Sequence, residues 1–290
     1  RFLRAYLSRR NRWKNQMNRD RKVLFLDMDG TTLDDRHQMS KKTREALRSC
    51  IEAGHEVVIT TGRPAASAKY LLTTYRLEEI GCRYVISYNG GLVLDCKTKE
   101  ILFQYTLPLA YTEVLAEYAR KEGLYLQTYE DNTILSEHDD ENLAHYMEKT
   151  SMEAKVVSDI AKALKKEPCK MLAIDIHGRK KLEGFVEKMK DWSEDKVDMY
   201  LSCPEYLEIV PKGVCKGKAL QDFCKRFGFL VENTVAAGDE ANDISMLQAA
   251  NIGCAVANAQ ESVKQAADYI TENDNNHAAV AEIIEKFMLS

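Results

Sequence analysis

The sequence lacks the marks of a membrane-spanning, zinc-binding or repetitive protein. None of its uninterrupted apolar runs approaches the roughly 20 residues that a transmembrane helix needs. No two of its eight cysteines have Cys-x-x-Cys spacing, and no cluster of cysteine and histidine indicates a zinc site. Internal repeats and long linkers rich in proline or serine are also missing. Because a chain of 290 residues can build its core without disulfides, we expect free thiols and a cytoplasmic protein.

A large excess of charge of either sign is missing too. The chain carries 41 basic and 45 acidic side chains, which gives a formal net charge of −4. This balance argues against a nucleic-acid-binding role. The composition, 45% hydrophobic and 30% charged, is that of a globular protein, and the length predicts about two domains. The oligomeric state, monomer or homodimer, stays open.

The first residues differ in charge from the rest of the chain. Residues 1–22 contain nine basic residues and one acid, so this segment carries +8 and the remainder −12. Its aromatic residues could share one face of a basic amphipathic helix, which would favour membrane-surface binding or organelle targeting. We favour the simpler interpretation, an extension over residues 1–21 that lies outside the fold, and do not expect a membrane partner. Met17 stands just before the first predicted strand and would make a natural start.

Strands and helices alternate at both ends of the chain. Apolar runs at 22–26, 56–61 and 84–88 predict strands, and a helix between the first two begins at the N-cap Ser40 and stops at Gly54. The alternation returns over 206–271. This pattern predicts an α/β fold with a Rossmann-like parallel sheet, built from residues 22–88 and 206–290.

The middle of the chain has a different pattern. Short strands are expected at 92–95, 101–105 and 124–128, and helices near 109–122, 139–149 and 178–191. Residues 170–176 and 197–202 are expected to form a further pair of strands. We therefore predict an α+β domain over residues 89–205, inserted into the core through short hinges.

Chemically distinctive residues follow the core strands, where open parallel sheets bind ligands. They are Asp27 and Asp29 in DMDGTTLD, Thr61 in TTGR, Lys216 in PKGVCKGKAL, and Asp239, Asn242 and Asp243 in GDEAND. Each alone has an ordinary explanation as a helix cap, a turn residue or a solvated charge. Together they place acids on both sides of one cation, and clustered acids repel unless a metal neutralises them. Hard oxygen ligands indicate Mg²⁺.

These four motifs, in this order and spacing, resemble those of the haloacid dehalogenase-like superfamily. The insertion, with SYNGG at its entrance, resembles the large α/β cap of the Cof-like subclass. The resemblance covers about residues 22–290. It implies a core that carries the chemistry and a cap that covers the substrate.

The resemblance also implies roles for individual residues. Asp27 corresponds to the nucleophile, Asp29 to the general acid/base, Thr61 to a phosphoryl contact and Lys216 to a neutralising cation. The metal ligands would be Asp27, the Asp29 carbonyl, Asp239, Asn242 and Asp243. The implied substrate contacts are Gly62, Asn89 and Gly90. For Arg63, a substrate contact and a salt bridge both stay open.

The expected activity follows from this chemistry. A dianionic phosphate monoester repels an attacking carboxylate, and Mg²⁺ with a lysine removes that repulsion. We expect a Mg²⁺-dependent phosphatase for a small phosphorylated metabolite, and favour a sugar phosphate over nucleotide, flavin or pyridoxal phosphates. A phosphotransferase or mutase, and a non-catalytic sensor of phosphorylated ligands, are the alternatives. Candidate cap contacts are Tyr111, Tyr125, Tyr129, His138, His145 and Tyr206.

Overall fold

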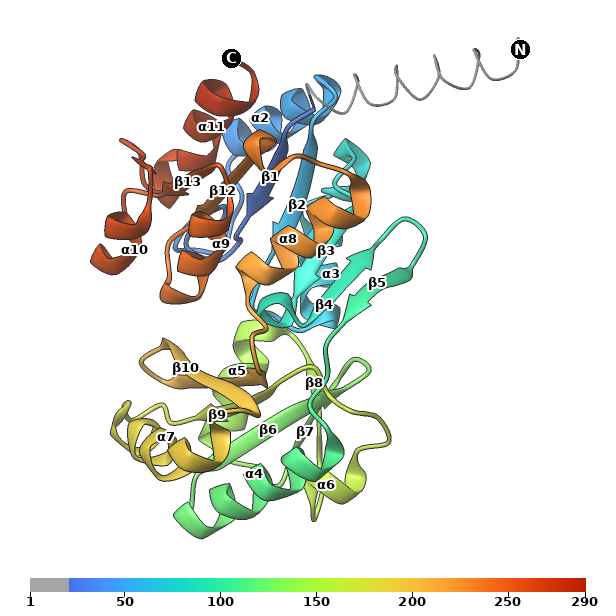
Figure 1. The fold of residues 1–290 in the computed structure, drawn as a ribbon, viewed down its shortest axis with the longest axis vertical. Coiled ribbons are helices and arrows are strands. Elements are labelled where there is room, and N and C mark those ends of the chain that lie inside the picture. Colours follow the sequence, from blue (N-terminus) through green and yellow to red (C-terminus); the bar gives the residue numbers. More distant parts are fainter. Residues whose placement is uncertain (1–20) are drawn as a thin grey trace.

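The computed structural model describes residues 21–290, so the predicted extension lies outside the described residues except for Arg21. It contains an eight-stranded and a six-stranded sheet, which belong to two bodies stacked one above the other (Figure 1). We call the body around the eight-stranded sheet the core and the body around the six-stranded sheet the cap. No helix in residues 21–290 combines the length and apolar character needed to cross a bilayer.

The core sheet has the order β14-β13-β12-β1-β2-β3-β4-β5. Six of its strands run parallel, and β4 and β5 add an antiparallel hairpin at one edge. The strands are β1 (Val23–Leu26), β2 (Glu56–Thr60), β3 (Tyr84–Ser87), β4 (Leu92–Asp95), β5 (Glu100–Gln104), β12 (Thr234–Gly238), β13 (Ile252–Ala255) and β14 (Tyr269–Ile270). The predicted α/β class with a parallel sheet is confirmed.

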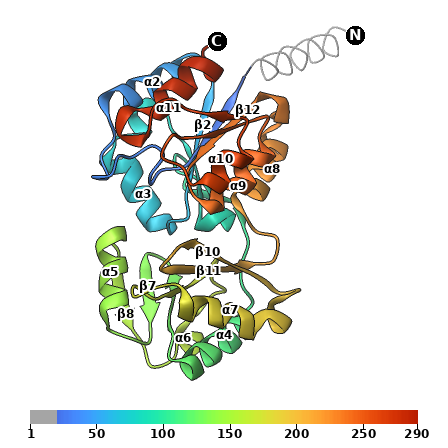
Figure 2. The same ribbon diagram turned by 90° about the vertical axis from the view of Figure 1, so that its left-hand side faces the viewer.

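Helices cover both faces of this sheet (Figure 2). One face carries α2 (Lys41–Glu52), α3 (Ala65–Thr74) and α11 (Ala279–Ile283), and the other carries α8 (Lys216–Phe227), α9 (Ile244–Ala249) and α10 (Glu261–Ala266). Successive residues of a strand point to opposite faces, so β1 serves both layers. Leu24 and Leu26 pack on the α2 side, and Val23 and Phe25 pack on the α8 side.

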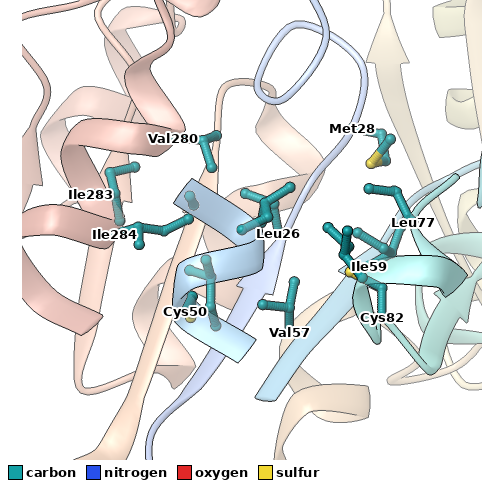
Figure 3. Close-up of a cluster of buried hydrophobic side chains, with 14 of the residues drawn as sticks. Leu26, Met28, Cys50, Val57, Ile59, Leu77, Cys82, Val280, Ile283 and Ile284 are labelled. Atoms are coloured by element: carbon teal, nitrogen blue, oxygen red, sulfur yellow. The ribbon is translucent and has the colours of Figure 1, made fainter. Parts of the chain in front are cut away.

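The α2 side of the core is closely packed around the central strands. Figure 3 shows Leu26 of β1 and Val57 and Ile59 of β2 beside Cys50 of α2 and Ile283 of α11. All five side chains have no exposed surface. This packing fixes where β1 and β2 end, and the residues that follow them are the predicted site residues.

The helix α2 begins and ends where its sequence signals predict. The hydroxyl of Ser40 accepts a hydrogen bond from the backbone N–H of Thr43 at 3.0 Å. Gly54, one residue past the C-cap, has a φ of +93°, a conformation that glycine adopts at little cost.

The cap sheet has the order β10-β11-β9-β6-β7-β8. Its strands are β6 (Tyr125–Glu130), β7 (Thr133–Ser136), β8 (Glu153–Val156), β9 (Met171–Ile174), β10 (Val197–Cys203) and β11 (Tyr206–Pro211). The helices α4 (Leu109–Glu122), α6 (Ile160–Ala163) and α7 (Lys180–Ser193) pack on one face, away from the core (Figure 1). The other face packs on α5 (Glu141–Thr150) and on Tyr88 and Leu92 of the core.

The strand pairing moves both predicted domain boundaries. After SYNGG the chain turns back on itself, and β4 pairs antiparallel with β3, so residues 92–104 belong to the core sheet and not to the insertion. The strand at 206–211, predicted for the core, pairs with β9 and β10 in the cap. It also lies between the two segments, 170–176 and 197–202, that were expected to pair with each other. The chain therefore enters the cap after β5 and leaves it after β11.

Candidate active site

A cavity of about 300 Å³ lies between core and cap, beside the ends of β1 and β2. The core wall holds Asp27, Asp29, His37, Thr61, Gly62, Arg63, Glu240 and Asn242. The cap wall holds Tyr146, Lys149, Thr150, Lys170, Ser202, Cys203, Tyr206 and Glu208. Residues far apart in the sequence thus meet at one cavity, as the strand-end pattern predicted, and the inserted domain covers it.

Three buried carboxylates and one lysine gather beside the cavity, and of these four residues Asp27 lines it. One carboxylate oxygen from each of Asp27, Asp239 and Asp243 lies within 4.8 Å of the others. The ammonium group of Lys216 donates to Asp27 Oδ1 and to Asp243 Oδ1, both at 2.6 Å. The Lys216 side chain is 1% exposed, so its charge is directed at these carboxylates and not at solvent.

The electrostatics of this cluster favour a further cation. Burial raises the pKa of Asp27 well above its usual range, and the charges of Asp243, Asp239 and Asp29 add to the effect against the opposing charge of Lys216. Burial and the charge of Asp243 raise the pKa of Asp239 to about 8. Lys216 alone therefore does not compensate the carboxylates. A small divalent cation with hard oxygen ligands fits both the charge and the donor set.

Local structure holds each carboxylate in place. The N–H groups of Asp239 and Glu240 donate to Asp243 Oδ2 at 3.0 and 3.1 Å, in the short helical turn η4 (Ala241–Asp243) that follows β12. The hydroxyl of Thr31 donates to Asp239 Oδ1 at 2.5 Å. Gly30 has a φ of +74°, and a Cβ there would lie 2.4 Å from Asp239 Oδ2. The DMDGTTLD loop therefore approaches the carboxylate of Asp239 too closely for any side chain at Gly30.

Asp29 is placed toward the cavity and held by two basic residues. The guanidinium of Arg63 donates to Asp29 Oδ2 at 2.6 Å and to Oδ1 at 2.7 Å, and His37 Nδ1 lies 3.5 Å from Oδ1. Partial burial raises the pKa of Asp29, but the hydrogen bonds from Arg63 and His37 outweigh it, so the pKa lies well below its usual range. Of the two interpretations of Arg63, the structure shows the salt bridge.

The loop with Thr61 is fixed by backbone hydrogen bonds. Thr61 N–H donates to Ile86 O at 2.8 Å, and Asn89 N–H donates to Thr61 O at 3.2 Å. The hydroxyl oxygen of Thr61 accepts from Arg63 N–H at 3.1 Å. Because the oxygen accepts this bond, the hydroxyl hydrogen is available to donate into the cavity.

Asn89 and Gly90, predicted as substrate contacts, are not among the described residues that line the cavity. Asn89 is fully buried with a φ of +56°, and its Oδ1 accepts from Asn242 Nδ2 at 2.9 Å. A Cβ on Gly90 would lie 2.4 Å from the carbonyl oxygen of Cys215, directly before Lys216. Both residues therefore join the loops that carry the site. Asn242 lines the cavity, and its Oδ1 is buried without a partner among residues 21–290.

The cap wall contains residues that sequence reasoning missed. Of the six candidate cap contacts, Tyr206 is the one that lines the cavity, and its hydroxyl is buried without a partner among residues 21–290. Lys170 and Glu208 were not singled out. The signal that could have found Glu208 is a charged residue inside the apolar strand YLEIVP, because buried charges need a partner.

The comparisons agree with this geometry. Residues 24–284 match the family described as haloacid dehalogenase-like hydrolase. A haloacid dehalogenase-like hydrolase from Bacteroides thetaiotaomicron has a similar structure, with a TM-score of 0.83 at 32% identity over 92% of this chain and 99% of that one. The pyridoxal phosphate phosphatase YbhA of Escherichia coli is 27% identical over 92% of this chain and 99% of its own. The 5-amino-6-(5-phospho-D-ribitylamino)uracil phosphatase YcsE of Bacillus subtilis is 27% identical over 93% of this chain and 97% of its own. The chain is thus an enzyme that belongs to the haloacid dehalogenase-like hydrolase family.

Proposed function

We propose that this protein is a Mg²⁺-dependent phosphatase that hydrolyses a small phosphorylated metabolite through a phosphoaspartate. The observation that carries the proposal is the position of Asp27. Its carboxylate lies on the cavity wall, bonded to Lys216, while Asp29 stands two residues further along the same wall. These positions support Asp27 as the group that attacks phosphorus and Asp29 as the group that serves the leaving oxygen.

The acidic cluster supports the proposed metal. Asp27, Asp239 and Asp243 would hold Mg²⁺, together with the backbone carbonyl of Asp29. Asn242 would complete or orient these metal ligands from the cavity wall. When bound, the ion would neutralise the negative charges of the carboxylates and of the substrate phosphate. Lys216 serves the same end from the protein side, because its ammonium group already bonds to two of these carboxylates.

The proposed reaction has two displacements. In the first, an oxygen of Asp27 forms a bond to phosphorus while the bond from phosphorus to the leaving oxygen breaks. Asp29 gives that oxygen a proton, which it must first take up from solvent or substrate, because Arg63 and His37 hold its carboxyl group ionised in the free protein. In the second, Asp29 takes a proton from water, and the water oxygen attacks phosphorus and releases Asp27. The hydroxyl of Thr61 and the ammonium of Lys216 donate hydrogen bonds to the phosphoryl oxygens. Gly62 has no side chain, so the phosphoryl group can approach the backbone there closely.

The size of the cavity supports a small substrate. Its cap wall includes Ser202, Tyr146 and Tyr206. The hydroxyl of Ser202 donates to Glu208 and that of Tyr146 accepts from Tyr129, whereas the hydroxyl of Tyr206 lacks a partner within residues 21–290. Such groups suit the hydroxyls of a sugar phosphate, which we favour over the pyridoxal and ribityl phosphates named for the two relatives. We place the reaction in the cytoplasm, since all eight cysteines are free.

A screen of phosphorylated metabolites tests the proposal. With Mg²⁺ present, the protein should release inorganic phosphate from p-nitrophenyl phosphate and from at least one sugar phosphate, and Asp27→Asn should release none. Repeating the assay with free sugar present and analysing the products separates transfer to water from transfer to an acceptor. No phosphate release from any ester would overturn the proposal.

A further inference from the structure

The cap contains a buried ion pair that reaches the catalytic loop of the core. Lys170 lies directly before β9 and is 1% exposed, and its Nζ lies 2.8 Å from Glu208 Oε2 on the neighbouring strand β11. The same ammonium group donates to the carbonyl oxygen of Gly62 at 2.9 Å, across 108 residues of sequence. Lys170 therefore joins the cap sheet to the loop that carries Thr61.

The surroundings of Lys170 hold it in this position. Its own carbonyl accepts from the hydroxyl of Thr128 at 2.9 Å, and the Tyr129 ring lies 5.6 Å from Nζ. Glu208 is fixed in turn, because its Oε1 accepts from the hydroxyl of Ser202 at 2.9 Å. A buried lysine is costly unless paired and hydrogen-bonded. Here the cap supplies the ion pair through Glu208, and the core supplies the hydrogen bond through Gly62 O. The bond to Gly62 is thus made by a group with little freedom to move.

Within the described part of the chain, Gly62 O is the one backbone group of residues 61–63 that is bonded to a cap side chain. The core provides the donors to its neighbours, since Asn89 N–H donates to Thr61 O and Tyr88 N–H donates to Arg63 O. Gly62 C=O and Arg63 N–H belong to one rigid peptide unit. Lys170 donates to the oxygen of this peptide unit, Gly62 O, while the N–H of the same unit, Arg63 N–H, donates to the hydroxyl oxygen of Thr61 at 3.1 Å.

We propose that Lys170, held by Glu208, is a positioning residue by which the cap orients the Thr61 hydroxyl toward the phosphoryl group. Lys170 fixes the plane of the Gly62–Arg63 peptide. It thereby fixes the direction of the Arg63 N–H, whose hydrogen bond orients the Thr61 hydroxyl. Closure of the cap would then complete the phosphoryl site as well as cover it. The inference rests on the proposed function, in which Thr61 donates to the phosphoryl oxygens.

A double-mutant cycle tests it. Lys170→Met should lower kcat about 10–100-fold, since small misplacements of catalytic groups have effects of this size, with little change in KM. The loss should be equal for p-nitrophenyl phosphate and acetyl phosphate, because a positioning role does not depend on the leaving group. In a Thr61→Val background the same change should have an effect below about threefold, since coupled residues are not additive. Lys166→Met, an exposed cap lysine nearby, should behave as wild type.

Three results would overturn the proposal: a wild-type kcat in Lys170→Met, an equal loss in both Thr61 backgrounds, or a loss that follows the size of the leaving group. If Lys170→Met does not fold because Glu208 is left unpaired, Lys170→Met/Glu208→Met removes both charges and enters the same cycle. Hydrogen exchange separates this inference from the proposed function. Exchange in residues 61–66 should be faster in Lys170→Met than in wild type, and unchanged in Lys166→Met, even if no ester is hydrolysed. Equal exchange rates in all three proteins would show that Lys170 does not hold the loop through Gly62.

Discussion

Arg63 binds Asp29 through two parallel hydrogen bonds, of 2.6 and 2.7 Å, and reaches the cap with its remaining nitrogen. Its Nη1 donates to the carbonyl of Lys149 near the end of α5 at 3.1 Å, and to the hydroxyl of Ser67 at 3.1 Å. Ser67 in turn donates to Thr150 O at 3.0 Å. The proposed acid/base is thus linked through one guanidinium to the cap.

Arg63→Met should lower kcat about 10–100-fold, because the Asp29 carboxylate loses the two bonds that fix its orientation. Ser67→Ala is the matched control. It removes one contact to the cap and one to Arg63 but leaves both bonds to Asp29, so its kcat should stay within about threefold of wild type. Steady-state kinetics with p-nitrophenyl phosphate measure both. Equal losses in the two variants would assign the effect to the cap contact instead.

Metal removal should abolish activity, and Mg²⁺ should restore it. The buried carboxylates of Asp27, Asp239 and Asp243 have Lys216 as their compensating cation, which leaves them under-neutralised. Ca²⁺ prefers longer bonds and more ligands, so it should not replace Mg²⁺. Mg²⁺ should also raise the melting temperature of wild type and not that of Asp239→Asn. Full activity after EDTA treatment and dialysis would contradict the mechanism.

Gly30→Ala should raise the Mg²⁺ concentration needed for half-maximal activity about tenfold or more, since its Cβ would displace Asp239. Gly123→Ala controls for backbone strain. Gly123 also has a positive φ, +57°, but a Cβ there meets nothing within 4 Å. The positive φ should cost each variant about 1–2 kcal/mol of stability. Gly30→Ala should lose more, because its Cβ meets Asp239, and it alone should change the metal requirement. A normal Mg²⁺ titration in Gly30→Ala would show that Asp239 is not a ligand.

The sequence predicts the residues of the site better than their partners. Asp27, Thr61 and Asp239 could be found because each follows an apolar strand, and this signal is local. The contacts of Arg63 with Lys149 and of Lys170 with Gly62 could not be found, because they depend on how the cap sits on the core. The boundary at β11 was missed for the same reason: an apolar strand fits either sheet, and pairing with β9 and β10 decides which.

The stability of the core should depend on the protonation of Glu56, far from the active site. Burial raises its pKa to about 7, and Asp95 adds to this against the opposing charges of Arg21 and Arg83. A carboxyl whose pKa is raised in the folded state binds an extra proton there between its unfolded and folded pKa values. Its stabilising contribution is therefore present at low pH and is lost as the pH rises through about 7.

Glu56→Gln should remove this dependence. Between pH 5 and pH 8 the free energy of unfolding of wild type should fall by about 2 kcal/mol relative to the variant. Urea unfolding at several pH values measures the difference, and Glu148→Gln, at an exposed position, should follow wild type throughout. A constant difference between wild type and Glu56→Gln would show that Glu56 does not titrate in this range.

The two proposed roles of Asp29 can be separated by the choice of leaving group. Its carboxyl group acts first as an acid toward the leaving oxygen and then as a base toward water, and general acid–base catalysis is typically worth about 10²–10⁴-fold. The first role matters little for p-nitrophenyl phosphate, whose leaving group is a stable anion. The second cannot be avoided, because water must still attack the phosphoaspartate.

Asp29→Asn, close in size and able to keep a hydrogen bond from Arg63, should therefore become phosphorylated on Asp27 by p-nitrophenyl phosphate and then stall. Intact-protein mass spectrometry after a rapid acid quench should show a phosphate adduct in Asp29→Asn and none in Asp27→Asn. Single-turnover kinetics should show a burst of nitrophenol followed by slow release of phosphate, because only the second displacement has lost its base. If Asp29→Asn turns over this ester as fast as wild type without an adduct, the carboxyl group that serves the leaving oxygen and water must be sought elsewhere on the cavity wall, and Glu240 is the next acid on its core side.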